Sequence, residues 1–198
     1  YVNRDRLTAG NDLVIALNAR FVNPSVIDAG RDLFIGARGV SNETSVGSRQ
    51  ASFDYPYYPG CRTEYDGLCT TTTEVPSSHA LMLVGRDLIA ATTFLHNRGA
   101  SILAGRDIRI DAPDVVNEDR RYGAVWSSSY YLIDVDAQSV GTPCTSGCVA
   151  DIDWRRTDSG AIELGVLPGV IQAGGRFVSD GGPLSPPSTT PVSPAPDG

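Results

Sequence analysis

Short stretches in which every second residue is apolar recur along the chain, and each follows a glycine and two polar residues. Three residues after Gly10, Gly30, Gly85 and Gly105 come Leu13, Leu33, Leu88 and Ile108. Two residues further on come Ile15, Ile35, Ala90 and Ile110. Side chains two residues apart lie on the same face of a β-strand. The pattern therefore predicts short strands with one buried and one exposed face.

These strands belong to copies of one motif, Ala/Val-Gly-Arg/Asn-Asp-Leu/Ile. Four copies begin at Ala9, Ala29, Val84 and Ala104, and a degenerate copy begins at Ala173. The first two copies are 20 residues apart, and so are the next two. A unit of this length cannot bury its own apolar face, whereas stacked units can, each adding one strand per sheet at about 4.8 Å. We therefore predict an all-β fold, a parallel β-helix with about 20 residues per coil.

Stacking of the coils predicts which residues become neighbours. Leu13 should lie beside Leu33, and Leu88 beside Ile108, with all four pointing inward on the same sheet. The recurring asparagines should stack at one corner as an amide ladder; they are Asn23, Asn42, Asn97 and Asn117. The Gly-Arg-Asp triplets are assigned to turns, in which glycine supplies an unusual backbone angle. The alternative fold is an antiparallel sandwich.

Two insertions interrupt the repeat within a β-helix segment that we place at residues 1–180. The distance from Gly30 to Gly85 is 55 residues and that from Gly105 to Gly174 is 69, and neither is a multiple of 20. The irregular stretches run from about 49 to 78 and from about 118 to 156. Residues 181–198 hold six of the 13 prolines and are interpreted as a proline-rich linker or tail.

All four cysteines lie in the insertions, as two local pairs, Cys61 with Cys69 and Cys144 with Cys148. Each pair could close a small loop as a disulfide, which indicates an oxidising, extracytoplasmic compartment. A zinc site is the rival interpretation, but neither pair has the usual two-residue spacing and no histidine lies near them. Four cysteines allow three pairings, so the connectivity stays open.

The insertions also hold ten of the 15 aromatic residues. They are Phe53, Tyr55, Tyr57, Tyr58, Tyr65, Tyr122, Trp126, Tyr130, Tyr131 and Trp154. Tyrosine and tryptophan offer a large contact area at low entropic cost, and insertions in a solenoid usually carry its binding surface. We take this set as the candidate partner-binding residues. The alternative is that they form small cores that attach each insertion to the coils.

Charge and hydropathy exclude several function classes. The formal net charge is −7, with 23 acidic residues against 16 basic ones that are all arginine, which argues against a nucleic-acid-binding surface. No apolar run approaches the roughly 18 residues of a membrane span. The N-terminal residues have no signal-peptide pattern, and we interpret them as internal to a larger protein.

Candidate chemistry is sparse, and we expect no catalytic site, metal or cofactor. Asp134 and Asp136, and likewise Asp151 and Asp153, are two residues apart, a spacing compatible with the carboxylate pair of a polysaccharide-cleaving β-helix enzyme. However, both pairs lie in the second insertion and no coil repeats them. His79 and His96 are single histidines without a nucleophile motif. Asn42-Glu43-Thr44 matches a glycosylation acceptor.

The motif resembles a known repeat. Ala-Gly-Arg-Asp-Leu, an alternating strand and then Asn-x-Gly, as in Asn97-Arg98-Gly99, is similar to the haemagglutinin repeat of filamentous-haemagglutinin-type exoproteins. These two-partner-secretion proteins include adhesins and contact-dependent growth inhibition effectors. The resemblance covers residues 7–46 and 81–120 well and 161–180 weakly. The family is poor in cysteine, so the two cysteine pairs depart from its pattern.

The resemblance implies a right-handed β-helix exported across both membranes of a Gram-negative cell by an outer-membrane secretion partner. We therefore expect a segment of a secreted or surface-exposed exoprotein that binds a receptor, protein or glycan, on the outer membrane or on a host cell. The alternatives are a structural stalk without binding and a polysaccharide-processing enzyme.

Overall fold

The computed structural model describes residues 1–53, 68–132 and 154–180, which form 18 β-strands and no helix. The described residues therefore contain no apolar helix that is long enough to cross a membrane. The chain divides into two compact units. Unit 1 comprises Tyr1–Gly47, Pro76–Tyr122 and the described residues from 165 onward, and unit 2 comprises Ser48–Val75 and Gly123–Leu164. The expected linker at 181–198 lies outside the described residues.

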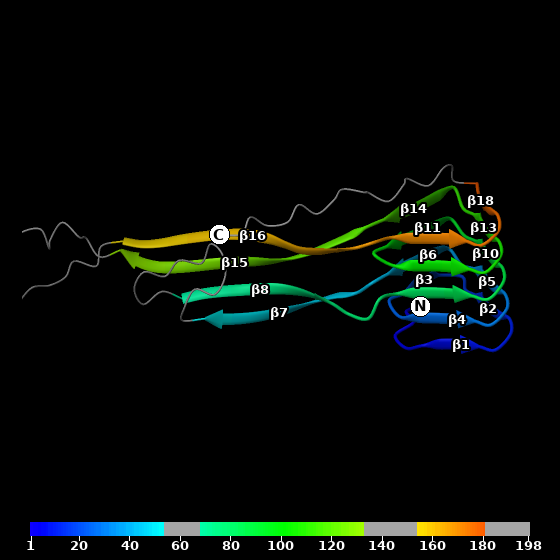
Figure 1. The fold of residues 1–198 in the computed structure, drawn as a ribbon, viewed down its shortest axis with the longest axis horizontal. Helices are drawn as coiled ribbons and strands as arrows, with labels where there is room; N and C mark the ends of the chain where they lie inside the picture. Colours follow the sequence, from blue (N-terminus) through cyan, green and yellow to red (C-terminus); the bar gives the residue numbers. More distant parts are fainter. Residues whose placement is uncertain (54–67, 133–153, 181–198) are drawn as a thin grey trace, which may run out of the picture. The chain divides into compact units, whose positions relative to one another are not determined.

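Fourteen of these strands form three parallel sheets in unit 1 (Figure 1). Sheet 1 contains β1 (Leu7–Ala9), β4 (Val26–Ala29), β9 (Leu81–Val84), β12 (Ser101–Ala104) and β17 (Val170–Ala173). Sheet 2 contains β2 (Leu13–Ala16), β5 (Leu33–Gly36), β10 (Leu88–Ala91), β13 (Ile108–Asp111) and β18 (Phe177–Ser179). Sheet 3 contains β3 (Arg20–Asn23), β6 (Gly39–Glu43), β11 (Phe94–Arg98) and β14 (Asp114–Glu118).

The chain visits the three sheets in a fixed rotation, sheet 1, then sheet 2, then sheet 3. Each circuit of three strands pairs in parallel with the circuits on either side of it. The strands on the two sides of Gly30, β4 and β5, belong to different sheets, and so do β12 and β13 around Gly105. These are therefore not the antiparallel hairpins of a sandwich. The stacked parallel sheets are compatible with the predicted β-helix.

The predicted leucine column forms the centre of the core. Leu13 is the register partner of Leu33, Leu33 of Leu88, and Leu88 of Ile108. The last three side chains are at most 1% exposed, and Leu13, on the end strand of its sheet, packs against them while partly exposed. The prediction for these four residues is confirmed, because alternation within each strand sends every second side chain toward the space that the three sheets enclose.

The repeated glycines are needed for a different reason from the one expected. In the described residues, only Gly99 has a positive φ, of 52°. At Gly85 a Cβ atom would lie 2.1 Å from the carbonyl oxygen of Gly30, and at Gly105 it would lie 2.3 Å from that of Gly85. Glycine is therefore required at the corner between sheets 1 and 2 because the backbones of successive circuits stack there in contact.

Replacing Gly85 by Ala should consequently lower the free energy of unfolding by about 2–3 kcal/mol, because the added methyl group meets backbone that cannot move aside. Gly10 is the matched control, since nothing lies within 4 Å of a Cβ atom placed there. Gly10→Ala should leave stability unchanged or raise it by up to about 1 kcal/mol. Urea denaturation of the two variants checks this. Equal midpoints would contradict the stacking argument.

The asparagine ladder is present and is longer than predicted. Each Nδ2 donates to the next Oδ1: Asn3 to Asn23 and Asn23 to Asn42 at 2.8 Å, then Asn42 to Asn97 and Asn97 to Asn117 at 2.7 Å. All five side chains are buried. The same amides also donate to backbone carbonyls near the start of the sheet 1 strands, as Asn42 does to Ser101 at 3.1 Å. The ladder therefore ties sheet 3 to sheet 1 in every circuit.

A second ladder, of opposite charges, follows the corner between sheets 1 and 2. Arg31 binds Asp12, Arg86 binds Asp32, and Arg106 binds Asp87, each through Nε and Nη2. Each aspartate thus holds the arginine of the next circuit. The sequence motif was assigned only to turns, so this inter-circuit role is new information from the structure.

The charge ladder predicts a loss of stability in acid. The hydrogen bond from Arg106 lowers the pKa of Asp87, and that from Arg31 lowers the pKa of Asp12. A carboxyl with a lowered folded-state pKa contributes stability above its unfolded pKa of about 3.9. That contribution should fall as the pH drops below about 4 and vanish below the folded-state pKa.

Urea denaturation between neutral pH and about pH 2.5 tests this prediction. The urea midpoint of Arg106→Gln should fall less on acidification than the midpoint of the natural chain. Arg38→Gln is the control, because Arg38 donates to the neutral Asn18 and not to a carboxylate. An identical acid-induced drop in all three proteins would rule out the ladder as its source.

Each insertion is closed at its base by a side-chain oxygen. Thr44 Oγ1 accepts a hydrogen bond from the N–H of Ala80, and Asp119 Oδ1 accepts one from the N–H of Gly169, both at 3.0 Å. Ala80 and Gly169 lie next to the start of β9 and β17 in sheet 1. Both insertions therefore leave at the same corner, between sheets 3 and 1, and span 45–79 and 120–168.

These limits differ from the expected 49–78 and 118–156, mainly at the end of the second insertion. Strand β16 (Trp154–Leu167) continues 11 residues past position 156. Residues Ala161–Leu167 alternate in the same way as a strand of the coils, and the weak resemblance to the repeat had been extended over them.

The two insertions together form one sheet. Sheet 4 has the order β16, β15 (Arg120–Leu132), β8 (Leu68–Pro76) and β7 (Val46–Phe53), as Figure 1 shows. Strands β8 and β15 pair antiparallel and join the first insertion to the second. Their union was not predicted, since each insertion had been treated as a separate cysteine-closed lobe.

Candidate functional site

The structure describes the side chains of two of the ten candidate aromatic residues, Tyr122 and Trp126. The other eight side chains lie outside the described residues: Phe53, Tyr55, Tyr57, Tyr58, Tyr65, Tyr130, Tyr131 and Trp154. So do the four cysteine side chains, Cys61, Cys69, Cys144 and Cys148, and the four aspartates considered for polysaccharide cleavage. The disulfides and the tyrosine surface therefore stay predictions.

Tyr122 and Trp126 lie over glycines of the neighbouring strand β16. A Cβ atom at Gly165 would come within 2.6 Å of the Tyr122 hydroxyl oxygen, and one at Gly160 within 2.7 Å of the Trp126 indole. Both aromatic side chains are half-buried. Packing of an aromatic ring over a glycine stabilises a strand that would otherwise lack side-chain contacts. These two residues therefore have a structural role in sheet 4.

Unit 2 buries small side chains beside Trp126. Thr71 is the register partner of Trp126, and Ala124 is the partner of Thr73, so the four share one face of the sheet. Thr71 is 1% and Ala124 3% exposed. The Thr71 hydroxyl donates to the carbonyl of Ala51 at 3.4 Å. Sequence reasoning missed this layer, although the run of four threonines at 70–73 has the β-branched composition of a strand.

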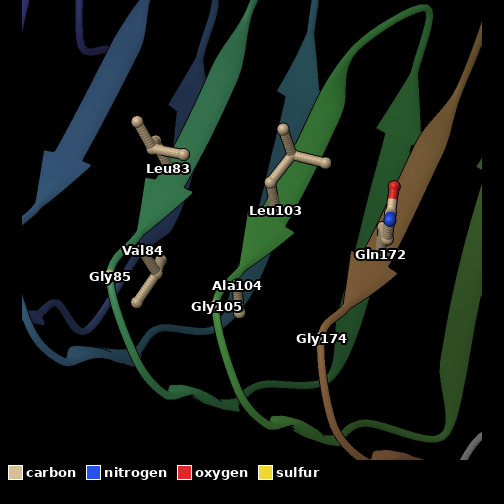
Figure 2. Close-up of a pocket in the computed structure, with 8 residues that line it drawn as sticks. All are labelled: Leu83, Val84, Gly85, Leu103, Ala104, Gly105, Gln172 and Gly174. Carbon is tan, nitrogen blue, oxygen red and sulfur yellow. The ribbon is translucent and has the colours of Figure 1, made fainter.

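A shallow hollow lies on the outer side of sheet 1, with a volume of about 390 Å³. Figure 2 shows Leu83 and Leu103 projecting from neighbouring strands β9 and β12, with Gln172 on β17 beside them. Glycines of the corner between sheets 1 and 2 also line it. Its lining contains no titratable side chain. The hollow can therefore hold an apolar group, but it supplies no acid, base or nucleophile.

The outer face of sheet 3 carries a polar cluster that includes a histidine. His96 Nε2 lies 2.9 Å from Asp114 Oδ2, and Ser41 is the register partner of His96 on β6. Ser41 is 1% exposed, and its Oγ accepts hydrogen bonds from Arg20 Nε and Nη2 at 3.1 and 2.6 Å. In the described part of the chain, no hydrogen bond joins Ser41 to His96. The three residues therefore do not form a nucleophile with an activating base.

The remaining sequence candidates have structural surroundings. His79 Nε2 lies 2.9 Å from Ser101 Oγ on the surface. Asn42, the glycosylation acceptor by motif, is fully buried within the amide ladder, so its amide is inaccessible in the folded chain. Within residues 1–53, 68–132 and 154–180, no three His, Cys, Asp or Glu side chains form a group that could hold a metal ion.

The five buried asparagines form one ladder between successive circuits and the Arg–Asp pairs form another, while the insertions form a sheet of their own. Comparison of the chain with protein-family models, curated proteins and solved structures gave no match.

Proposed function

We propose that this chain is a segment of a large secreted or surface-exposed bacterial exoprotein, an adhesin or a contact-dependent inhibition effector. In this proposal unit 1 is a right-handed parallel β-helix that displays unit 2, and unit 2 binds a receptor, protein or glycan, on another cell. The segment has no catalytic role, and an outer-membrane secretion partner exports the parent protein. The resemblance of the motif to haemagglutinin repeats supports these assignments.

The observation that carries the proposal is the way in which the insertions join the stack. Both leave at the corner between sheets 3 and 1, where a backbone N–H donates to a side-chain oxygen across the base of each, from Ala80 to Thr44 and from Gly169 to Asp119. Removing the 35 residues 45–79 reduces the 55-residue spacing to 20, and removing the 49 residues 120–168 reduces the 69-residue spacing to 20. Insertions that leave the coils intact are typical of binding segments carried by a solenoid.

The disulfides complete this proposal. Cys61 with Cys69 and Cys144 with Cys148 would close short loops within the two insertions, in keeping with an oxidising compartment outside the cytoplasm. Closed loops of this kind reduce the entropy that a binding surface loses when it engages its partner.

The deletion of both insertions tests the proposal. A variant with residue 44 joined to 80 and residue 119 joined to 169 should keep the cooperative unfolding of a stacked β-structure, because the leucine core and both ladders lie outside the deleted segments. The same variant should lose binding to target cells, measured by flow cytometry with labelled protein. A folded variant that binds as well as the natural chain would overturn the proposal.

A double substitution examines the predicted binding residues. Tyr130→Ala with Tyr131→Ala should weaken cell binding by a few kcal/mol, the scale of interface hot spots, without changing the melting temperature of unit 1. Trp126→Ala is the matched contrast, because Trp126 packs over Gly160 and its loss should destabilise sheet 4. Unchanged binding by the double variant, with a lowered melting temperature, would show the two tyrosines to be structural.

The second candidate function is a structural stalk. It is favoured by the packing of Tyr122 and Trp126 over glycines, since both described aromatic candidates stabilise the sheet. The binding assay separates the two functions, because a stalk without binding gives no cell-binding signal that the deletion could remove.

A further inference from the structure

The outer face of sheet 2 carries a mainly apolar row that is interrupted by Arg109. Register pairing aligns one outward residue from each of the five strands, in the order Val14, Phe34, Ile89, Arg109 and Val178. The four apolar members are 66%, 36%, 36% and 48% exposed, respectively. The largest apolar patches on monomeric proteins, of about 300–600 Å², are often functional.

Apart from the charge ladder along one edge, the charges of this face lie at its β13 and β18 end. Two residues further along each strand stand Ala16, Gly36, Ala91 and Asp111, which are in register with one another. Arg109 and Asp111 bind each other through Arg109 Nε at 2.8 Å, and Asp180, which directly follows β18, also attracts Arg109. The outer face of sheet 3, by contrast, carries Arg20, Glu43 and Asp114, among other charged groups. Sheet 2 is therefore suited to pack against another flat β-surface.

The row is self-complementary under two-fold symmetry. A two-fold axis parallel to β10 and passing beside Ile89 reverses the order of the strands in a second copy. This places Val14 opposite Val178 of that copy, Ile89 opposite its own equivalent, and Phe34 opposite Arg109. A guanidinium over an aromatic ring is a favourable contact. The single charged position of the row therefore meets the single aromatic one.

We propose that the outer face of sheet 2 is a lateral interface between two copies of this chain, related by that axis. Five strands about 4.8 Å apart and about 13 Å long give a face of roughly 300 Å² per copy, against about 800 Å² in a typical stable interface. The contact is therefore weak and reversible. Each copy carries a net charge of −7, so salt should strengthen the contact by screening the repulsion.

Sedimentation equilibrium of the full chain, from about 10 µM to about 1 mM protein, tests the proposal. The weight-average mass should rise from monomer toward dimer with concentration, and more steeply at about 1 M than at about 0.1 M salt. Ile89→Glu should abolish the rise, because the symmetry brings two like charges together. Arg109→Glu should reduce it, since Phe34 loses its cationic partner. Val125→Glu, at an exposed apolar residue of sheet 4, should leave it unchanged.

Three results would overturn the proposal. One is a monomer at every concentration and salt level, and another is an Ile89→Glu variant that associates like the natural chain. The third is association that appears only after residues 181–198 are removed, which would assign the face to that segment of the same chain. Each variant should remain folded, because the substituted side chains are exposed. Circular dichroism of each variant checks that a change in association is not caused by unfolding.

Discussion

Leu33→Asp is expected to unfold unit 1 or to lower its free energy of unfolding by at least about 4 kcal/mol. Leu33 is fully buried between Leu13 and Leu88, at the centre of the column that joins the circuits. A carboxylate at this position has no cation or hydrogen-bond donor within the apolar core. The measurement is chemical denaturation followed by circular dichroism, together with the yield of folded protein.

Phe34→Asp is the matched control, because it places the same charge one residue along the same strand on the outer face. It should change the free energy of unfolding by less than about 1 kcal/mol. If the two variants were equally destabilised, then inward and outward positions of β5 would not differ as the alternation requires. A stable Leu33→Asp variant would contradict the position of the core.

Asn97→Ala is expected to have the second largest effect, a loss of about 3 kcal/mol in the free energy of unfolding. Asn97 is fully buried and lies in the middle of the ladder. Its Oδ1 accepts from Asn42, and its Nδ2 donates to Asn117 and to the carbonyl of Ala100. Alanine removes the acceptor of one Asn42 N–H and the donor to Asn117 Oδ1, in addition to leaving a cavity.

Asn18→Ala provides the comparison, since Asn18 accepts a single hydrogen bond, from Arg38, on the surface. Its effect should be below about 0.5 kcal/mol. Asn97→Asp tests the direction of the hydrogen bond to Asn117, because an ionised carboxylate cannot donate to it. Its destabilisation should therefore ease as the pH falls and the carboxyl becomes protonated. Equal stability of Asn97→Ala and Asn18→Ala would show that the ladder contributes little.

The candidate site could be predicted from the sequence only in part. The breaks in the 20-residue spacing located both insertions, since no regular coil accounts for 55 or 69 residues. Their pairing through β8 and β15 could not be predicted, because the two strands are about 50 residues apart and share no repeated motif. The packing of Trp126 over Gly160 depends on that sheet and was hidden for the same reason.

The sequence by itself determined the stacked parallel sheets, the inward leucine column and the asparagine ladder. Each follows from a local pattern repeated at a constant spacing, so the register of one pair of circuits predicts the others. Three features were decided only by the tertiary structure. They are the requirement for glycine at the corner between sheets 1 and 2, the pairing of Arg86 with Asp32, and the ends of the insertions. These depend on contacts between circuits and between insertions, whose distances in space do not follow from the spacing of residues along the chain.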